Sequence, residues 1–254
     1  MIKFFVPKED ILGDKIYLTS KDDVKHLVKV LRSRVGDGVV ISDMESMEYQ
    51  TEIAEIGDME VVLRVLESHP FENEPATRVT LYQGVPKGPK LETVVQKTVE
   101  LGVDRVVPVF MARTVVADKG NFSKKVARLQ KIADEAVKQC KRDRIPEVSE
   151  PLDFKGMMQE IRQEDYDAIL IPYESKEGYT IKDALRFTDD VKLKKGSHIA
   201  IIIGPEGGFE ESEIEALQDE FDRKAQVVTL GKIIMRTETA GMAALAMIMY
   251  ELEL

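Results

Sequence analysis

The pattern that most limits the fold is a regular alternation of apolar strand-like runs with helically spaced segments, which begins near Thr77. Because near-continuous apolar strands must be covered on both faces, this alternation predicts an α/β domain built on a parallel sheet. The predicted strands are Val79–Gln83, Arg105–Phe110, Asp167–Pro172, His198–Gly204 and Gln226–Leu230. The predicted helices are Lys90–Leu101, Ser123–Cys140, Phe154–Glu164, Glu210–Phe221 and Thr239–Leu252.

The chain has a different character before residue 70, where short strand-like runs are separated by Gly-Asp pairs that suit tight turns. One helix is predicted around Val24–Leu31, whose apolar residues follow helical spacing. We therefore expect a small β-rich domain over residues 1–70 and a second domain over 76–254, joined by the polar, proline-bounded segment His69–Pro75. The predicted strands of the first domain are Ile2–Val6, Lys15–Leu18, Gly38–Ser42, Tyr49–Ile56 and Glu60–Glu67.

The net charge is −10, but the basic residues are clustered. The Lys124–Arg144 segment holds eight basic residues against three acids. The segment from Val24 to Arg34 holds four basic residues and no acid, namely Lys25, Lys29, Arg32 and Arg34. Either run alone is most simply a solvated helix face, and the two together favour a polyanionic partner such as nucleic acid.

Cysteine and histidine usage narrows the chemistry. Cys140 is the only cysteine, so no disulfide can form within the chain, and a reducing, cytoplasmic location is expected. Cys140 lies on the apolar stripe of its predicted helix, which indicates a small buried residue rather than a nucleophile. No metal site is predicted, because the three histidines are scattered at His26, His69 and His198.

No membrane segment is expected. The longest weakly polar stretch, Ala240–Tyr250, is about half of the ~20 residues that a membrane span requires, and it predicts a buried helix. The N-terminus turns charged too early for a signal peptide.

The loops that follow predicted strands are the candidate ligand sites, because open α/β sheets bind ligands at the carboxyl ends of their strands. One of them, Gly204–Gly208, matches neither a P-loop nor GxGxxG. Pro205 removes an amide donor, and Glu206 places negative charge where a phosphate would dock. The loop is therefore either a tight turn or a cradle for an adenosyl ligand that has cationic groups and no phosphates. Ile171–Glu174 is a second such loop.

The third loop, Leu230–Thr239, leads into the last predicted helix. Thr237, Glu238 and Thr239 are suited to capping that helix, which we expect of at least one of them. Arg236 has no comparable structural reason, since an arginine packed between a loop and a helix normally has an anionic partner.

Four stretches of the chain together match the pattern of a known family. They are Gln83–Gly88 with Glu100–Gly102, Glu135–Arg142 with Ile145–Glu147, Ile203–Gly208, and Leu230–Ala240. On these stretches the chain resembles the RsmE family, SPOUT-class methyltransferases that methylate N3 of a uridine in 16S ribosomal RNA. The resemblance covers essentially the whole chain, and the last two stretches are the most specific. Lys232 and Met235 stand where the family pattern has arginine and leucine.

The resemblance implies features that periodicity does not show. It implies a PUA-like RNA-binding β-barrel at the N-terminus, followed by an α/β SPOUT domain whose parallel sheet ends in a C-terminal trefoil knot. It also implies S-adenosylmethionine as the cofactor and a homodimer with the cofactor site near the subunit interface. The implied partner is 16S rRNA within the small ribosomal subunit.

The resemblance also assigns roles to residues. Arg236 is expected to stabilise the uridine anion and Glu238 to accept its proton. The cofactor is expected to contact Tyr173, Glu174, Gly204, Pro205, Glu206, Gly207, Leu230, Gly231, Ile234, Met235 and Ala240. Contacts to RNA are expected from Pro86, Lys87 and Arg142, and from the basic run Lys25, Lys29, Arg32 and Arg34.

Three alternatives remain open at this point. A ribose 2′-O-methyltransferase of the same fold class would give a different modified nucleoside, which mass spectrometry distinguishes. A non-catalytic RNA-binding protein with this fold would not bind S-adenosylmethionine. An enzyme acting on nucleotide phosphates is disfavoured by the acidic loop and by the missing P-loop.

Overall fold

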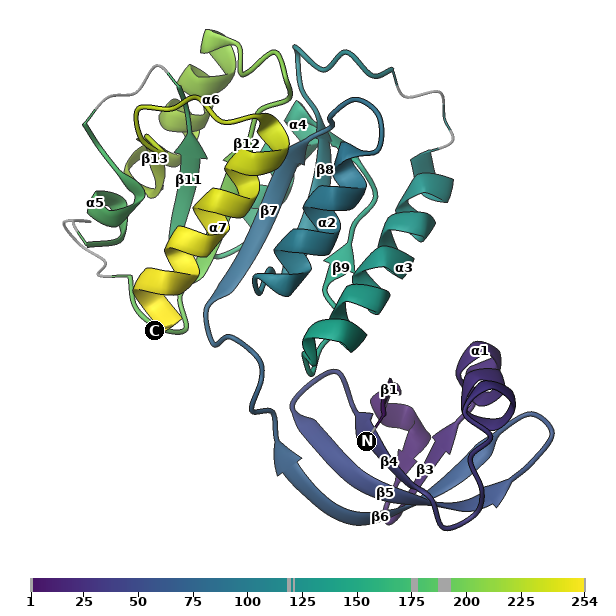
Figure 1. Ribbon diagram of the computed structural model, residues 1–254. Helices are drawn as coiled ribbons and strands as arrows, with labels where there is room; N and C mark the ends of the chain where they lie inside the picture. The colour runs from purple at the N-terminus through teal and green to yellow at the C-terminus, as the bar shows by residue number, and fades with distance from the viewer. Residues whose placement is uncertain (1, 118–119, 121, 175–177, 187–192, 254) are drawn as a thin grey trace. The chain divides into compact units, whose positions relative to one another are not determined.

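The structure is a computed structural model that describes every residue except 1, 118–119, 121, 175–177, 187–192 and 254 (Figure 1). The chain divides into two compact units. The first unit comprises Met1–Glu74 and Val137–Ile145, and the second comprises Pro75–Ala136 and Pro146–Leu254. The boundaries at 1–70 and 76–254 stay a prediction, and the first unit also takes in a short segment from the middle of the chain.

The first unit is built on a six-stranded sheet with the order β1-β4-β5-β6-β3-β2. The pair β1–β4 is parallel and the other four pairs are antiparallel. β6 continues to Pro70 and so enters the segment predicted as a linker, because Met47 to Gln50 of β5 pair with its last residues. The strands are β1 (Lys3–Phe5), β2 (Ile11–Leu12), β3 (Lys15–Leu18), β4 (Gly38–Ser42), β5 (Met47–Ile56) and β6 (Val61–Pro70), with a 3₁₀ turn at Lys8–Asp10.

The predicted helix of this unit is confirmed as α1 (Lys21–Lys25) followed by a π-helical turn, His26–Val30. Ser20 begins it, because its side chain accepts a hydrogen bond from the Asp23 amide. Val24 and Leu27 are buried in the core of the unit. The basic residues of the segment lie on the other side, and all four of Lys25, Lys29, Arg32 and Arg34 are exposed.

A buried ion-pair cluster that includes Arg142 joins the two chain segments of the first unit, and the RNA contact of Arg142 stays a prediction. The guanidinium of Arg142 contacts Glu74 at 2.7 Å and the residue is only 6% exposed. The same Glu74 carboxylate accepts the backbone amides of Asp143 and Arg144 at 2.7 and 3.0 Å. An arginine held in this way contributes to the stability of the unit, and little of its side chain is exposed.

The second unit has an all-parallel sheet with the order β10-β8-β7-β12-β11-β13, and β9 pairs with β8. This confirms the α/β architecture expected from the alternation. The five predicted strands are all present, and two short ones are added. The strands are β7 (Arg78–Gly84), β8 (Arg105–Phe110), β9 (Glu147–Val148), β10 (Leu152–Asp153), β11 (Ala168–Pro172), β12 (His198–Ile203) and β13 (Ala225–Val228).

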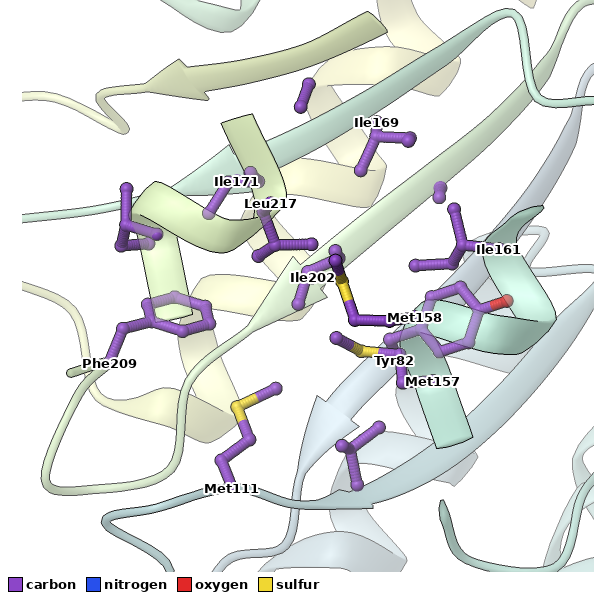
Figure 2. Packing of buried hydrophobic residues seen from close by; sticks show 14 of the residues in the cluster. Tyr82, Met111, Met157, Met158, Ile161, Ile169, Ile171, Ile202, Phe209 and Leu217 are labelled. Carbon is purple, nitrogen blue, oxygen red and sulfur yellow. The ribbon is translucent and has the colours of Figure 1, made fainter. Parts of the chain in front are cut away.

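Helices cover both faces of this sheet (Figure 1). On one face α4 and α6 pack against the strands, and Figure 2 shows Met157, Ile161 and Leu217 directed toward Tyr82 and Ile202. On the other face α7 lies over β7 and β12, flanked by α2 and α5. The helices are α2 (Lys90–Glu100), α3 (Phe122–Cys140), α4 (Phe154–Gln163), α5 (Ile181–Arg186), α6 (Glu211–Phe221) with a 3₁₀ turn at Asp222–Lys224, and α7 (Thr237–Glu253).

Two details differ from the sequence expectations. The short helix α5 was not predicted, because six residues are too few to display a helical period. Cys140, expected to be buried, is half-buried at the end of α3, with its Sγ 3.8 Å from the carbonyl oxygen of Val137. Among the described residues, no helix is both long and apolar enough to cross a membrane.

Candidate functional site

The site lies where four neighbouring strands of the second unit end. β7, β12, β11 and β13 are adjacent in the sheet and parallel, so the loops after their carboxyl ends meet at one edge. Two adjoining cavities of about 380 and 600 Å³ open there. They have five lining residues in common, Pro172, Glu174, Ile234, Met235 and Ala240. Cavities of this size are typical of small-molecule sites.

The structure brings most of the predicted cofactor residues to these cavities. The smaller cavity is lined by Gly204, Pro205 and Glu206 together with Arg236, and the larger one by Tyr173, Leu230 and Gly231. Glu174, Ile234, Met235 and Ala240 line both. Gly207 lines neither cavity, and its carbonyl instead accepts a hydrogen bond of 3.2 Å from Arg113. Glu238 also lines neither cavity.

Close backbone approach explains two of the small residues at this edge. A Cβ on Gly84, at the end of β7, would lie 2.5 Å from the backbone nitrogen of Pro205. A Cβ on Gly204 would lie 3.1 Å from the backbone of Gly208. Glycine at both positions lets the 204–208 loop fold back tightly over the ends of β7 and β12.

Thr237 fastens the start of α7 to this loop. Its hydroxyl donates to the carbonyl oxygen of Gly204 at 2.6 Å and accepts from the Gln83 amide at 2.8 Å. The amides of Thr239 and Ala240 both bond to the carbonyl oxygen of Arg236 at 2.9 Å, and capping of the helix by Thr237, Glu238 or Thr239 stays a prediction. The Thr237 hydroxyl therefore links two loops of the site.

The N-terminus of α6 is closed to phosphate. Glu213, which is 5% exposed, accepts the Glu210 amide at 2.9 Å and the Ala112 amide at 3.0 Å. Because the Glu213 carboxylate occupies the Glu210 amide at this helix end, a phosphate docking there would meet negative charge. This helix end follows Phe209, which lines the smaller cavity, and so disfavours a phosphate group on that side of the site.

Glu206 is held by two donors from the loop and helix that follow β7. Its Oε1 accepts the Lys87 amide at 2.9 Å and the Lys90 ammonium at 3.0 Å. Burial alone would raise the pKa of Glu206, but these donors outweigh it and hold the pKa below the usual range. The hydrogen bond to Glu206 is also the main reason why the pKa of Lys90 is raised.

Lys90 is a charged residue of the site that the sequence analysis did not identify. It lines the smaller cavity beside Arg236, and its Nζ also lies 3.4 Å from Oε2 of Glu238. The signal was present in the sequence, because Lys90 stands two residues after the Gln83–Gly88 stretch and opens the next helix. The positive end of the helix dipole disfavours a lysine at this position, so tertiary contacts must stabilise it.

Arg236 lies at the mouth of the smaller cavity with its side chain exposed. Among the described residues, no carboxylate is within ion-pair distance of its guanidinium, so the anionic partner expected from the sequence is not supplied by that part of the chain. The arrangement offers an arginine to an anionic group brought by a ligand.

The fold and the site together define an α/β protein with a ligand pocket that disfavours phosphate groups and has an arginine at its edge. A family model described as an RNA methyltransferase domain matches residues 72–249, and a second, described as an RNA methyltransferase PUA domain, matches residues 18–66. The chain therefore belongs to the RNA methyltransferase family, and within it to the RsmE group.

The similarity extends over full lengths. The chain is 34% identical to ribosomal RNA small subunit methyltransferase E of Bacillus subtilis, with 100% of this chain and 98% of that protein covered. The Neisseria gonorrhoeae enzyme of the same name, solved with S-adenosylmethionine, is 28% identical with a TM-score of 0.76 over 99% of this chain and 98% of that one. A Legionella pneumophila methyltransferase solved with the same cofactor is 28% identical, with a TM-score of 0.77 over 98% and 97%.

Proposed function

We propose that this protein transfers a methyl group from S-adenosylmethionine to N3 of a uridine in 16S ribosomal RNA. The observation that carries the proposal is the phosphate-averse cavity at the strand ends with an unpaired arginine at its edge. Relatives that carry the name of this small-subunit methyltransferase support the choice of substrate.

The residues present fit the cofactor. S-adenosylmethionine has no phosphate and carries cationic sulfonium and ammonium groups, and the site offers Glu174 and Glu206 with a carboxylate-capped helix end. Gly231, at a φ of 117°, leaves open space where a side chain would stand. The apolar walls for the adenine are Leu230, Ile234, Met235 and Ala240. Tyr173, Gly204, Pro205 and Gly207 complete the proposed binding set.

The bound cofactor supplies an electrophilic methyl group, so that an in-line displacement needs no covalent enzyme nucleophile. The chain must orient the uracil, favour loss of its N3 proton and stabilise the resulting negative charge. Arg236, exposed at the cavity mouth, is our candidate for that stabilisation. Glu238 stays our candidate for proton acceptance, although its Oε2 is buried and lies 3.4 Å from the Lys90 ammonium.

RNA binding is proposed for the basic segment of the first unit. Lys25, Lys29, Arg32 and Arg34 are all exposed, and among the described residues none has a carboxylate within ion-pair distance. Such unpaired cations can neutralise phosphates and release counterions. In the second unit Lys87 is exposed and remains a candidate, whereas Pro86 is buried.

We also propose a homodimer in the cytoplasm, acting on 16S rRNA within the small subunit. Ile233 and Ile234, beside the cavities, are 80% and 79% exposed, and Tyr250 on α7 is 68% exposed. Large apolar side chains exposed next to a ligand site are typical of surfaces that a partner covers. The trefoil knot stays a prediction of the family resemblance.

The test is methyl transfer from labelled S-adenosylmethionine to small subunits isolated from cells that lack the enzyme, followed by mass spectrometry of the nucleosides. We expect N3-methyluridine at one position of 16S rRNA. A 2′-O-methylated nucleoside would replace the proposed reaction by ribose methylation. A protein that binds RNA but gives no heat with S-adenosylmethionine in calorimetry would be a non-catalytic binder.

A further inference from the structure

Lys90 joins three segments that are far apart in the chain. It is the first residue of α2, its Nζ lies 3.0 Å from Glu206 in the loop after β12, and the same Nζ lies 3.4 Å from Glu238 in the first turn of α7. It also lines the smaller cavity. One ammonium group thus bridges two walls of the proposed cofactor pocket.

Local preferences do not place a lysine there. The first turn of a helix carries the positive end of the dipole, which disfavours a cation. Lys97 on the same helix shows the ordinary surface case, because it pairs with Glu100 three residues later at 2.8 Å. Lys90 instead reaches out of its own helix to two carboxylates, so tertiary contacts account for its position.

Glu238 depends on this contact. Its Oε2 is buried and has no hydrogen-bond partner, and among the described residues Lys90 is the cation within ion-pair distance of it. The other charged groups that line the cavity are Glu174, Glu206 and Arg236. A buried carboxylate oxygen without donors is costly unless a cation lies beside it.

We propose that Lys90 is the positioning residue of the cofactor pocket, because its ammonium group ties Glu206 to Glu238 and so holds the 204–208 loop against the start of α7. This inference rests on the proposed function, since it takes the cavity to be the cofactor site. Thr237 makes the neighbouring link through its hydroxyl, and Lys90 makes the charged one.

Removing the ammonium would leave Glu206 and Glu238 facing each other without their shared cation. The repulsion between them would spread the two walls, and one carboxylate would bind a proton more readily than in the wild type. The loss would therefore depend on pH. It would be largest in mildly alkaline buffer, where both carboxylates are ionised and repel each other, and smaller in mildly acidic buffer, where a proton bound to one of them relieves the repulsion.

The experiment measures the dissociation constant of S-adenosylmethionine by calorimetry across that pH range for the full-length protein. For Lys90→Ala we expect roughly tenfold weaker binding at neutral pH, which corresponds to about 1.4 kcal/mol. Lys90→Arg, which keeps the charge, should remain within a few-fold of the wild type. Lys97→Ala is the matched control, because it removes an exposed ion pair from the same helix.

A double-mutant cycle separates this role from general loss of structure. If Lys90 acts through Glu238, then Lys90→Ala combined with Glu238→Ala should bind no more weakly than the worse single variant. If Lys90→Ala does not fold, the cycle is measured with Lys90→Gln and Glu238→Gln instead. These two substitutions remove the charges and keep side chains of similar size.

The outcomes for the two proposals are distinct. Suppose that the wild-type protein binds the cofactor and methylates rRNA, and that Lys90→Ala binds the cofactor with the same affinity at every pH. That result would overturn the positioning role and leave the proposed function intact. Additive effects in the double-mutant cycle would also overturn it. Wild-type protein that does not bind S-adenosylmethionine would overturn both.

Discussion

The first and second units use arginine in opposite ways. Arg142 of the first unit is 6% exposed and clamped to Glu74 at 2.7 Å. Arg236 of the second unit is exposed at the edge of a cavity, and no carboxylate among the described residues pairs with it. An arginine with its partner built into the fold serves stability, whereas one left unpaired beside a cavity is available to a ligand.

Two lysines allow a second comparison. In the first unit Lys3 contacts both Glu48 and the buried Asp143, and Lys3 and Glu48 line a cavity of that unit. In the second unit Lys90 also bridges two carboxylates and lines a cavity. The two lysines differ in the place of the cavity, because that of Lys90 lies at the carboxyl ends of parallel strands, where α/β sheets bind ligands.

The largest effect should follow from replacing Arg236, since it is the arginine that the comparison assigns to a ligand. For Arg236→Ala we expect methyl transfer to fall by about 10²- to 10³-fold, because one charge-stabilising group is lost. Thermal stability and cofactor affinity should hardly change. Single-turnover methyl transfer, calorimetry and a melting curve measure the three quantities.

Arg236→Lys provides the companion variant and should retain part of the activity, because it keeps the charge but not the planar fork. Unchanged methyl transfer by Arg236→Ala, with the cofactor still bound, would remove Arg236 from the chemistry.

Replacing Arg142 should lower the stability of the protein and leave methyl transfer by the folded protein largely unchanged. Arg142→Ala leaves the Glu74 carboxylate without its cation and should lower the free energy of unfolding by about 3 kcal/mol. Denaturant titration measures this change. Arg128→Ala, which breaks a solvent-exposed pair between Arg128 on α3 and Glu92 on α2, is the control and should hardly change the free energy of unfolding. A fully stable Arg142→Ala protein that had lost only RNA affinity would contradict the stabilising role and support the RNA contact predicted from the sequence.

The stability of the first unit should also respond to acid through Asp143. Burial would raise the pKa of Asp143, but the hydrogen bond from Lys3 and the backbone amides of Asn73 and Glu72 hold it below the ordinary value of 3.8. A carboxyl with a lowered folded pKa adds stability above its unfolded pKa and loses it as the pH falls through the folded value.

We therefore expect unfolding free energies measured at decreasing pH to decline less steeply for Asp143→Asn than for the wild type. The variant should be the less stable of the two at neutral pH. If the free energy of unfolding of the two proteins declined equally steeply with falling pH, Asp143 would not contribute to this decline.

The smallest effects should come from the exposed lysines of the first unit. Lys25→Ala and Lys29→Ala should each weaken RNA binding a few-fold and reduce the slope of log affinity against log salt by about one. Filter binding at several salt concentrations measures both. Lys97→Ala, on the other unit, should change neither, and equal effects for all three lysines would mean that the basic segment is not a specific RNA surface.

Much of the architecture could be predicted from local pattern. The alternation after Thr77 predicted the five main parallel strands, and helical spacing predicted α2, α3, α4, α6 and α7 to within a few residues. The loops after the strands were identified as the ligand edge, because parallel strands point their carboxyl ends to one side. The short α5 and the extension of β6 to Pro70 were not predicted, since neither has a periodic signal of its own.

The sequence by itself determined the fold class, through periodicity, and which loops could meet, through the common direction of parallel strands. In the sequence, Arg142 and Arg236 were both candidates for binding a ligand or RNA, and nothing in the local pattern distinguished them. Only the tertiary structure decided that Arg142 is paired with Glu74 across 68 residues of chain, that Arg236 is not so paired in the described part, and that Lys90 bridges Glu206 and Glu238. The physical reason is that ion pairing depends on distances of a few ångströms between side chains remote in sequence, and no local pattern contains those distances.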